Sequence, residues 1–467
     1  MFILIPMILA GSFLSLMVLG LMYQNNEMLI AALSFASVLP VVVISCFEKV
    51  DDILSPNKLF SLILILSVPG FCIAAFFIAD SIESQYAMFS QTSDDLIAGI
   101  ILLLIGSLAF TCGTFYTLKP RSAALRDYFC DSGNKMRFLA VAVLVITIFA
   151  AIRYTIETKA FLSLADGVLS QKRVHEATVG VAPRGSALSH WRILAIWLPQ
   201  ATLIVFSALV WSGKLRPRRM DKVLFGFLLL CSISIPLITA SRMAVIEIFL
   251  ILLLLRHYLY KKLPMRRAAL IAIIALFVLG FLGELRKTNK SETFSPLSTV
   301  TAVIGKGYFL DLGKTSIIAN KFPEENDLLY GYSLALSTIA FIPRQIWPEK
   351  PVVRIGYFVG QEVIKLNNQT GIPPGFVAEL YMNFHYIGMI PIMLFVGLLV
   401  GTAYKRMTRY NYSIGSVIFY VMVIDVTLFS LLSGDFVYAV FQSLTWGVLL
   451  MAILRFVCIR RLVKVRA

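Results

Sequence analysis

Charged residues are scarce in this chain, and its cysteines and histidines offer little to a disulfide framework or a metal site. Only 15% of the 467 residues are charged, whereas 58% are hydrophobic and the mean hydropathy is +0.83. Soluble domains average about 25% charged residues, so this balance excludes an ordinary soluble domain. The six cysteines show no CxxC spacing, and the four histidines are scattered. We therefore expect neither disulfides nor a bound metal.

Sequence motifs for nucleotide chemistry are missing as well. The chain has no P-loop, no glycine pattern for a dinucleotide, no HExxH and no GxSxG. Nucleotide-driven transport is therefore unsupported, and we expect no cofactor. A formal net charge of +16 is compatible with nucleic-acid binding. The distribution of the basic residues instead follows membrane topology, so we expect no nucleic-acid partner.

Long apolar runs recur over the whole chain and have the length that spans a bilayer as a helix. We predict an all-α polytopic membrane protein, a single transmembrane domain over residues 1–467 with about twelve helices. The first run lacks a basic n-region and a cleavage site, so we interpret it as a retained span rather than a signal peptide. The predicted spans are 2–22, 28–46, 59–79, 96–117, 138–153, 193–212, 223–240, 243–257, 268–284, 387–404, 413–431 and 437–456.

Lysine and arginine define the predicted orientation. The segments 46–58, 118–137, 213–222, 256–267, 404–412 and 455–467 hold 25 of the 42 basic residues. The short loops 23–27, 80–95 and 432–437 hold none, whereas Asp80, Glu83, Asp94, Asp95 and Asp435 lie there. By the positive-inside rule, both termini are predicted to be cytoplasmic.

Nearly all of the other basic residues gather in two long loops on the predicted outer side, where the rule does not place them. The first loop is 154–192 and the second is 285–386, a large loop predicted to contain short helices. Solvated loop charges and snorkelling side chains are one interpretation. Two cationic loops together favour an anionic ligand at the membrane–water boundary. The candidate ligand-binding cations are Arg173, Arg286, Arg344, Lys350 and Arg354.

Arg242 is a further candidate, in the short turn TASRMA between two apolar runs. A charge in so short a turn stays near the membrane surface. One interpretation is an interfacial anchor. The other is a cation directed at a lipid phosphate, because the guanidinium offers a fixed fork of donors to phosphate oxygens.

The stretch Phe341–Tyr386 is the longest polar interruption of the chain. Pro373–Pro374 is well placed to start a helix, on which Glu379 and Asn383 share one face. A carboxylate beside cations could accept a proton from a sugar hydroxyl, so Glu379 is a candidate base; a salt bridge that fixes the loop is the alternative. His385 is a second candidate base, or else an interfacial histidine. Aromatic residues such as Tyr381 could pack at the interface or bind sugars.

These residues also carry a resemblance. FIPRQIWPEKP, followed by TGIPPGFVAELYMNFHYIG, resembles the bacterial oligosaccharide repeat-unit polymerases, the Wzy-type O-antigen and enterobacterial common antigen polymerases. The arginine of TASRMAVIEIFLILLL resembles a second feature of that family. The local motifs cover about 60 residues, and the pattern of spans and basic outer loops fits along the whole chain.

The resemblance implies a membrane glycosyltransferase of the GT-C type in the bacterial inner membrane. Its substrates would be oligosaccharides linked to undecaprenyl pyrophosphate, polymerised at the periplasmic face for O-antigen, capsule or exopolysaccharide, without a metal. Arg242 and Lys350 match the family's basic positions; Arg344, Arg354 and Glu379 match more loosely. An O-antigen ligase and a non-enzymatic transporter or flippase of lipid-linked sugars are the alternatives. The sequence leaves open whether a chain-length regulator binds.

Overall fold

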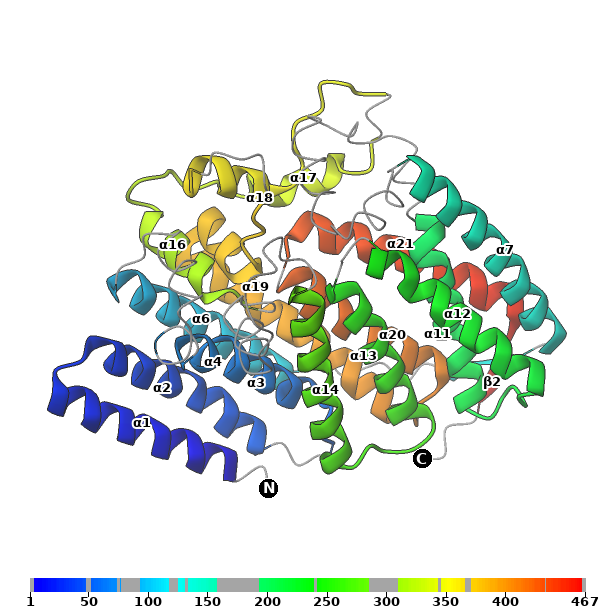
Figure 1. Ribbon diagram of the computed structural model, residues 1–467, viewed down its shortest axis with the longest axis horizontal. Coiled ribbons are helices and arrows are strands. Elements are labelled where there is room, and N and C mark those ends of the chain that lie inside the picture. Colours follow the sequence, from blue (N-terminus) through cyan, green and yellow to red (C-terminus); the bar gives the residue numbers. More distant parts are fainter. Residues whose placement is uncertain are drawn as a thin grey trace.

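In the residues that it describes, the computed structural model is a bundle of helices with one small two-stranded sheet (Figure 1). It describes residues 4–47, 52–73, 76, 93–116, 125–130, 133–157, 193–238, 242–284, 310–342, 346–365, 371–432 and 434–463. The long helices are α1 (Leu4–Tyr23), α2 (Asn26–Cys46), α3 (Pro56–Ser67), α6 (Ser93–Phe115), α7 (Gly133–Glu157), α11 (Leu198–Trp211), α12 (Arg219–Ile238), α13 (Arg242–Leu259), α14 (Met265–Glu284), α19 (Phe376–Arg409), α20 (Ile414–Asp425) and α21 (Phe436–Val457).

Shorter elements make up the rest of the described secondary structure. They are α4 (Pro69–Ile73), α16 (Leu312–Lys321), α17 (Tyr332–Ile339), α18 (Ile355–Phe358), and the π-helical turns η2 (Ile193–Trp197), η3 (Val359–Val363) and η4 (Val426–Leu431). Helices α16, α17 and α18 lie together at one end of the bundle, which we call the loop face (Figure 1). The described part of the loop 285–386 therefore contains short helices.

The helices make this a multi-pass membrane protein. Within the described ranges, eight helices are long and apolar enough to cross a membrane. A helix lies at each of the twelve predicted spans, although α12, α13 and α14 do not meet that criterion and Ile414–Leu428 is shorter. The number twelve and the orientation therefore stay predictions. The eight helices are Ile5–Tyr23, Asn26–Cys46, Pro56–Ile73, Asp95–Phe115, Gly133–Arg153, Ile193–Trp211, Phe376–Arg409 and Phe436–Val457.

Helices α6 and α19 pack with their backbones almost in contact, because glycines leave no side chain between them. A Cβ atom on Gly397 would lie 2.0 Å from the carbonyl oxygen of Phe110. One turn further, a Cβ on Gly401 would lie 2.3 Å from the Thr114 oxygen, and Gly113 approaches Leu394 equally closely. Small residues four apart allow this approach between membrane helices, where packing replaces the hydrophobic effect.

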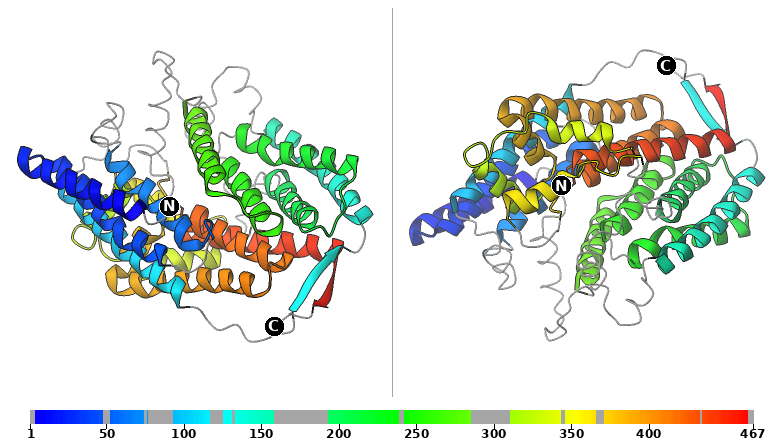
Figure 2. Two further views of the ribbon diagram at one scale, coloured as in Figure 1. Left: turned by 90° about the horizontal axis from the view of Figure 1, so that it is seen from below. Right: turned by 90° about the horizontal axis from the view of Figure 1, so that it is seen from above.

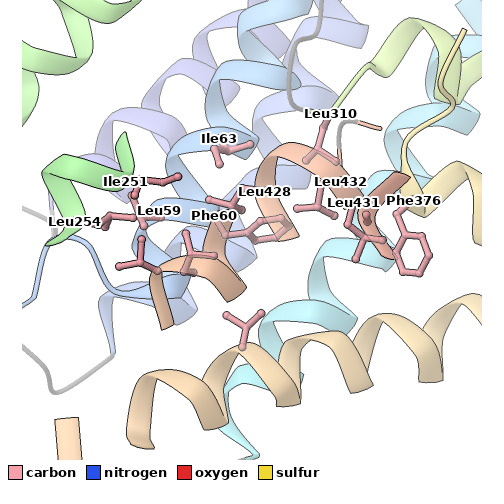
Figure 3. Close-up of a cluster of buried hydrophobic side chains, with 14 of the residues drawn as sticks. Leu59, Phe60, Ile63, Ile251, Leu254, Leu310, Phe376, Leu428, Leu431 and Leu432 are labelled. Atoms are coloured by element: carbon pink, nitrogen blue, oxygen red, sulfur yellow. The ribbon is translucent and has the colours of Figure 1, made fainter. Parts of the chain in front are cut away.

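A buried apolar cluster joins the two halves of the chain (Figure 3). Leu59, Phe60 and Ile63 of α3 meet Ile251 and Leu254 of α13 and Leu428 and Leu431 of η4 in this close-up. Phe376, the first residue of α19, lies at the edge nearest the loop face and is 1% exposed. The start of α19 is thus fixed by packing on its apolar side.

At the opposite end of the bundle, the buried carboxylate of Asp52 connects three parts of the fold. Its Oδ2 accepts hydrogen bonds from the hydroxyls of Tyr404 (2.7 Å) and Tyr258 (3.0 Å), and Oδ1 faces His257 Nε2 at 3.1 Å. Burial raises the pKa of Asp52, but the hydrogen bonds from His257 and Tyr404 outweigh it, so the pKa is lowered overall. The linker before α3 is thereby held against α13 and α19.

The sequence did not predict the sheet. Strands β1 (Leu125–Cys130) and β2 (Cys458–Val463) pair antiparallel, with Leu125 opposite Val463 and Cys130 opposite Cys458. Figure 2 shows the two arrows side by side at one edge of the molecule. The ribbon joins segments more than 300 residues apart, and neither strand shows the alternation that marks a half-buried strand.

Candidate functional site

Most of the candidate polar residues that the structure describes meet at the loop face. We call this group the loop-face site. It is built by the starts of α19 and α21 together with α17 and the segment that enters α18. Its residues are Ser333, Lys350, Arg354, Glu379, Asn383 and Asp435.

Two glycines bring the starts of α19 and α21 together. The N–H of Gly375 donates to the carbonyl of Gly434 at 3.0 Å. Gly375 has a φ of 79°, and a Cβ there would lie 2.8 Å from the Leu432 oxygen. A side chain is therefore excluded by both conformation and space. The predicted helix after Pro373–Pro374 begins at Phe376, as expected.

Glu379 lies in the first turn of α19 and is fully buried at 0% exposure. Its Oε1 accepts a hydrogen bond from Ser333 Oγ at 2.7 Å, and Oε2 accepts one from the Phe436 N–H at 2.8 Å. The carboxylate therefore binds both α17 and the first residue of α21. Glu379 therefore does fix the loop, as the alternative to a base supposed. It does so through a hydroxyl and a backbone amide rather than through a salt bridge to a cation. The prediction that Glu379 is a base stays a prediction.

Asn383 continues the network one turn further along α19. Its Nδ2 donates to Ser333 Oγ and to the Glu379 carbonyl, both at 2.7 Å, and its Oδ1 accepts from the Gly331 N–H at 3.0 Å. The amide thus joins α19 to the start of α17. Because Asn383 is 0% exposed, each of these bonds replaces one that water would supply.

The break in α19 at His385 explains why α17 docks here. His385 has φ 55° and ψ −162°, which no helical residue adopts. The break frees backbone carbonyls of the preceding turn, and the N–H groups of Leu329 and Tyr330 donate to those of Met382 and Asn383 at 2.9 and 3.1 Å. The extended segment before α17 thereby satisfies a helix end that would otherwise be unpaired.

Arg354 presents a cation at the surface of the loop-face site. Its Nε and Nη2 atoms both lie 3.0 Å from Oδ2 of Asp435, and its guanidinium stacks over the Tyr438 ring at 5.5 Å. Asp435 is 0% exposed and also caps α21, because its Oδ1 accepts from the Tyr438 N–H at 2.8 Å. The Arg354 side chain is 47% exposed, and no described residue accepts a hydrogen bond from Nη1. One edge of the guanidinium is fixed while the other remains open.

Lys350 has a different environment, although it lies only four residues away. Its side chain is buried, with 8% exposure for the residue. The ammonium donates to the carbonyls of Ile339 (3.3 Å), Ala340 (3.1 Å) and Ile342 (2.8 Å). Ile339 is the last residue of α17, and the other two lie just after it. An ammonium has three donors, and three carbonyls receive them here. The prediction that Lys350 binds pyrophosphate is not tested by this geometry, which gives the side chain a capping role.

Tyr381 and His385 lie on the side of α19 that faces α16. The Tyr381 hydroxyl donates to the Phe322 carbonyl at 3.1 Å, and the His385 ring packs against Tyr381 and Tyr386, with centroids 4.8 Å apart in each pair. The Glu379 carboxylate oxygens are bound by α17 and α21 instead. The two candidate bases therefore belong to different groups of contacts.

The remaining candidate cations are not placed in the site. Arg173, Arg286 and Arg344 lie outside the residues that the structure describes, as does the side chain of Arg242 at the start of α13. Sequence reasoning overlooked Ser333 and Asp435. An aspartate directly before an apolar helix is a readable N-cap signal, so Asp435 could have been found. Ser333 carries no such signal.

No known family description, characterised protein or solved structure matches this chain. The loop-face site is therefore interpreted from its own residues. In the site, the Arg354 guanidinium has one edge fixed and the other open. Beside it, a buried hydrogen-bond network around Glu379 joins α17, α19 and α21. Such an arrangement can bind an anion at the end of the bundle without moving the helices themselves.

Proposed function

We propose that this chain is a membrane glycosyltransferase that polymerises oligosaccharide repeat units carried on undecaprenyl pyrophosphate, at the outer face of the bacterial inner membrane. The observation that carries the proposal is Arg354. It is held by Asp435 and Tyr438 at the end of a helix bundle, and among the described residues its Nη1 has no acceptor. A guanidinium with one edge fixed and one edge free matches the oxygens of a lipid-linked phosphate.

The reaction places a clear demand on such a cation. A hydroxyl of the acceptor sugar attacks the anomeric carbon of the donor chain, and the bond from that carbon to the pyrophosphate oxygen breaks. Negative charge develops on the departing undecaprenyl pyrophosphate, and a base takes the hydroxyl proton. A preoriented guanidinium stabilises the developing charge without reorganisation. Arg354 is assigned this role, with Arg242 as a second cation of the same kind.

Glu379 is assigned a positioning role in this proposal, because both of its oxygens already accept hydrogen bonds inside the protein. Glu379→Gln keeps an acceptor oxygen for one of them. We expect this variant to extend chains slowly with an unchanged pH profile. If Glu379 were the base, the Glu379→Gln variant would instead lose chain extension, and the pH dependence of the reaction would change as well. His385 stays the other candidate base.

The test uses a strain that lacks the chromosomal copy and carries variants on a plasmid. Arg354→Ala should leave cells with single repeat units and no ladder of chain lengths on a gel. Arg256→Ala is the matched control, because it removes an exposed arginine from the far end of α13. A normal ladder from Arg354→Ala would overturn the assignment.

The same strain separates the polymerase from the alternative functions. Cells capped with one repeat unit indicate a lost polymerase. Long lipid-linked chains that accumulate without transfer indicate a lost ligase. Lipid-linked units that never reach the outer face indicate a lost flippase. The purified wild-type chain should also release undecaprenyl pyrophosphate only when both donor and acceptor units are present.

A further inference from the structure

Two carboxyl groups lie side by side in the bundle, on two helices that the sequence predicts to cross the membrane. Glu247 is on α13, and Asp425 is the last residue of α20 before the π-helical turn η4. One donor, Nε2 of Gln442, lies within hydrogen-bond distance of an oxygen of each group, so the two carboxyls are neighbours. Among the described residues, neither forms an ion pair with lysine or arginine. Intramembrane acids of this kind are expensive and usually serve a function.

A third helix completes the group. Nε2 of Gln442 on α21 lies 2.7 Å from Oε1 of Glu247 and 3.4 Å from Oδ2 of Asp425. The amide oxygen of Gln442 accepts from Ser430, in η4. Each residue lies about two turns or less from the end of its helix nearest the loop face. The group therefore joins α13, η4 and α21 at one depth, beneath the loop-face site.

Within the described part of the chain, one atom of the group has no partner. Asp425 is 1% exposed, and its Oδ1 accepts no hydrogen bond from a described residue although it is shielded from solvent. Trp446 lies one turn beyond Gln442 on α21, and its buried Nε1–H likewise finds no acceptor among these residues. A buried acceptor left open beside a second carboxyl indicates that a small polar ligand belongs there.

We propose that Glu247 and Asp425 form a proton-binding site inside the membrane, which holds one exchangeable proton between the two carboxyls. Two adjacent carboxylates without a cation would repel one another in an apolar interior, so the proton is what allows them to be neighbours. Its release would leave two negative charges side by side and push α13 away from the end of α20.

A proton fits this site better than a metal ion. A metal cation needs several oxygen ligands, whereas Gln442 directs its NH₂ group at the carboxylates. The other described titratable side chains on the surrounding helices form no ion pair with either carboxyl. On α12, α13, α20 and α21 these are Lys222, Cys231, Arg256, His257, Tyr258, Tyr420, Tyr438 and Arg455, with Arg219 and Asp221 at the start of α12.

The test uses an apolar carbodiimide, which reacts with protonated carboxyl groups, on the full chain in lipid nanodiscs. Asp221 is the internal control, because Arg137 holds it as a carboxylate through bonds of 2.7 and 2.9 Å. At neutral pH, mass spectrometry should find label on Glu247 or Asp425 at about tenfold or more above Asp221, falling by up to about tenfold per pH unit once the pair titrates. Sodium chloride should reduce the carbodiimide labelling of the pair no more than choline chloride does.

Other results would overturn the proposal. Specific protection by sodium would mean a cation site. A second measurement covers the case in which the reagent does not reach the pair. Infrared difference spectra of the wild type should show a protonated carboxyl that shifts in heavy water and is lost in the Glu247→Gln, Asp425→Asn double variant. A wild type without label, and with the same infrared signal as the double variant, would refute the site.

Discussion

The close approach of α6 and α19 predicts that two chemically identical substitutions have opposite effects. Gly397→Ala would place a Cβ 2.0 Å from the Phe110 oxygen. Ordinary carbon–oxygen contacts are about 3.3 to 3.6 Å, so the helices must separate by about 1.3 to 1.6 Å at this point. Overpacking of this kind costs about 1–3 kcal/mol. A Cβ on Gly447 of α21 would lie more than 4 Å from every described neighbour, so Gly447→Ala meets no obstacle there.

Gly447→Ala should instead stabilise the chain by about 0.5–1 kcal/mol, because alanine removes the helix penalty of glycine. Thermal unfolding of the purified variants in one detergent checks both signs. The midpoint should fall for Gly397→Ala and rise slightly for Gly447→Ala. Equal midpoints for the two variants would refute the backbone-to-backbone packing. Because Val377 packs on Gly106 of α6, we also expect Gly397→Ala to disturb the loop-face site more than Gly447→Ala does.

Three further predictions follow from polar contacts. Lys350→Met keeps the stem but leaves the carbonyls at the end of α17 without their donor, so we expect a loss of about 1–3 kcal/mol in thermal unfolding. Tyr404→Phe removes one of the hydrogen bonds to Asp52 and should cost about 1–2 kcal/mol by the same measurement, since the acceptor is charged. The hydrogen bond from Arg137 lowers the pKa of Asp221, so the stability it contributes is present above about pH 4 and is lost as pH falls through the lowered value; Asp221→Asn should remove that acid slope.

The positions of the helices could be predicted because the information is local. An apolar run of bilayer length specifies a helix wherever it occurs, and Pro373–Pro374 specifies where α19 begins. The contacts of the site are not local. Glu379 reaches Ser333, 46 residues away, and Phe436, 57 residues away. Neither proline nor glycine precedes the break at His385 directly, and Gly388, whose Cβ would lie 2.3 Å from the Phe384 Cβ, follows only three residues later.

Charge counting could not separate the roles of Lys350 and Arg354, because it treats both as outer-loop cations. Helix ends and irregular backbone near a membrane need donors and acceptors from the protein, and a loop side chain serves that need first. Lys350 gives all three of its donors to the end of α17. Arg354 has more donors than its single carboxylate partner can accept, and its side chain is half exposed. A cation that binds a ligand is therefore one whose donors exceed its internal acceptors, which makes Arg354 rather than Lys350 the first residue to test.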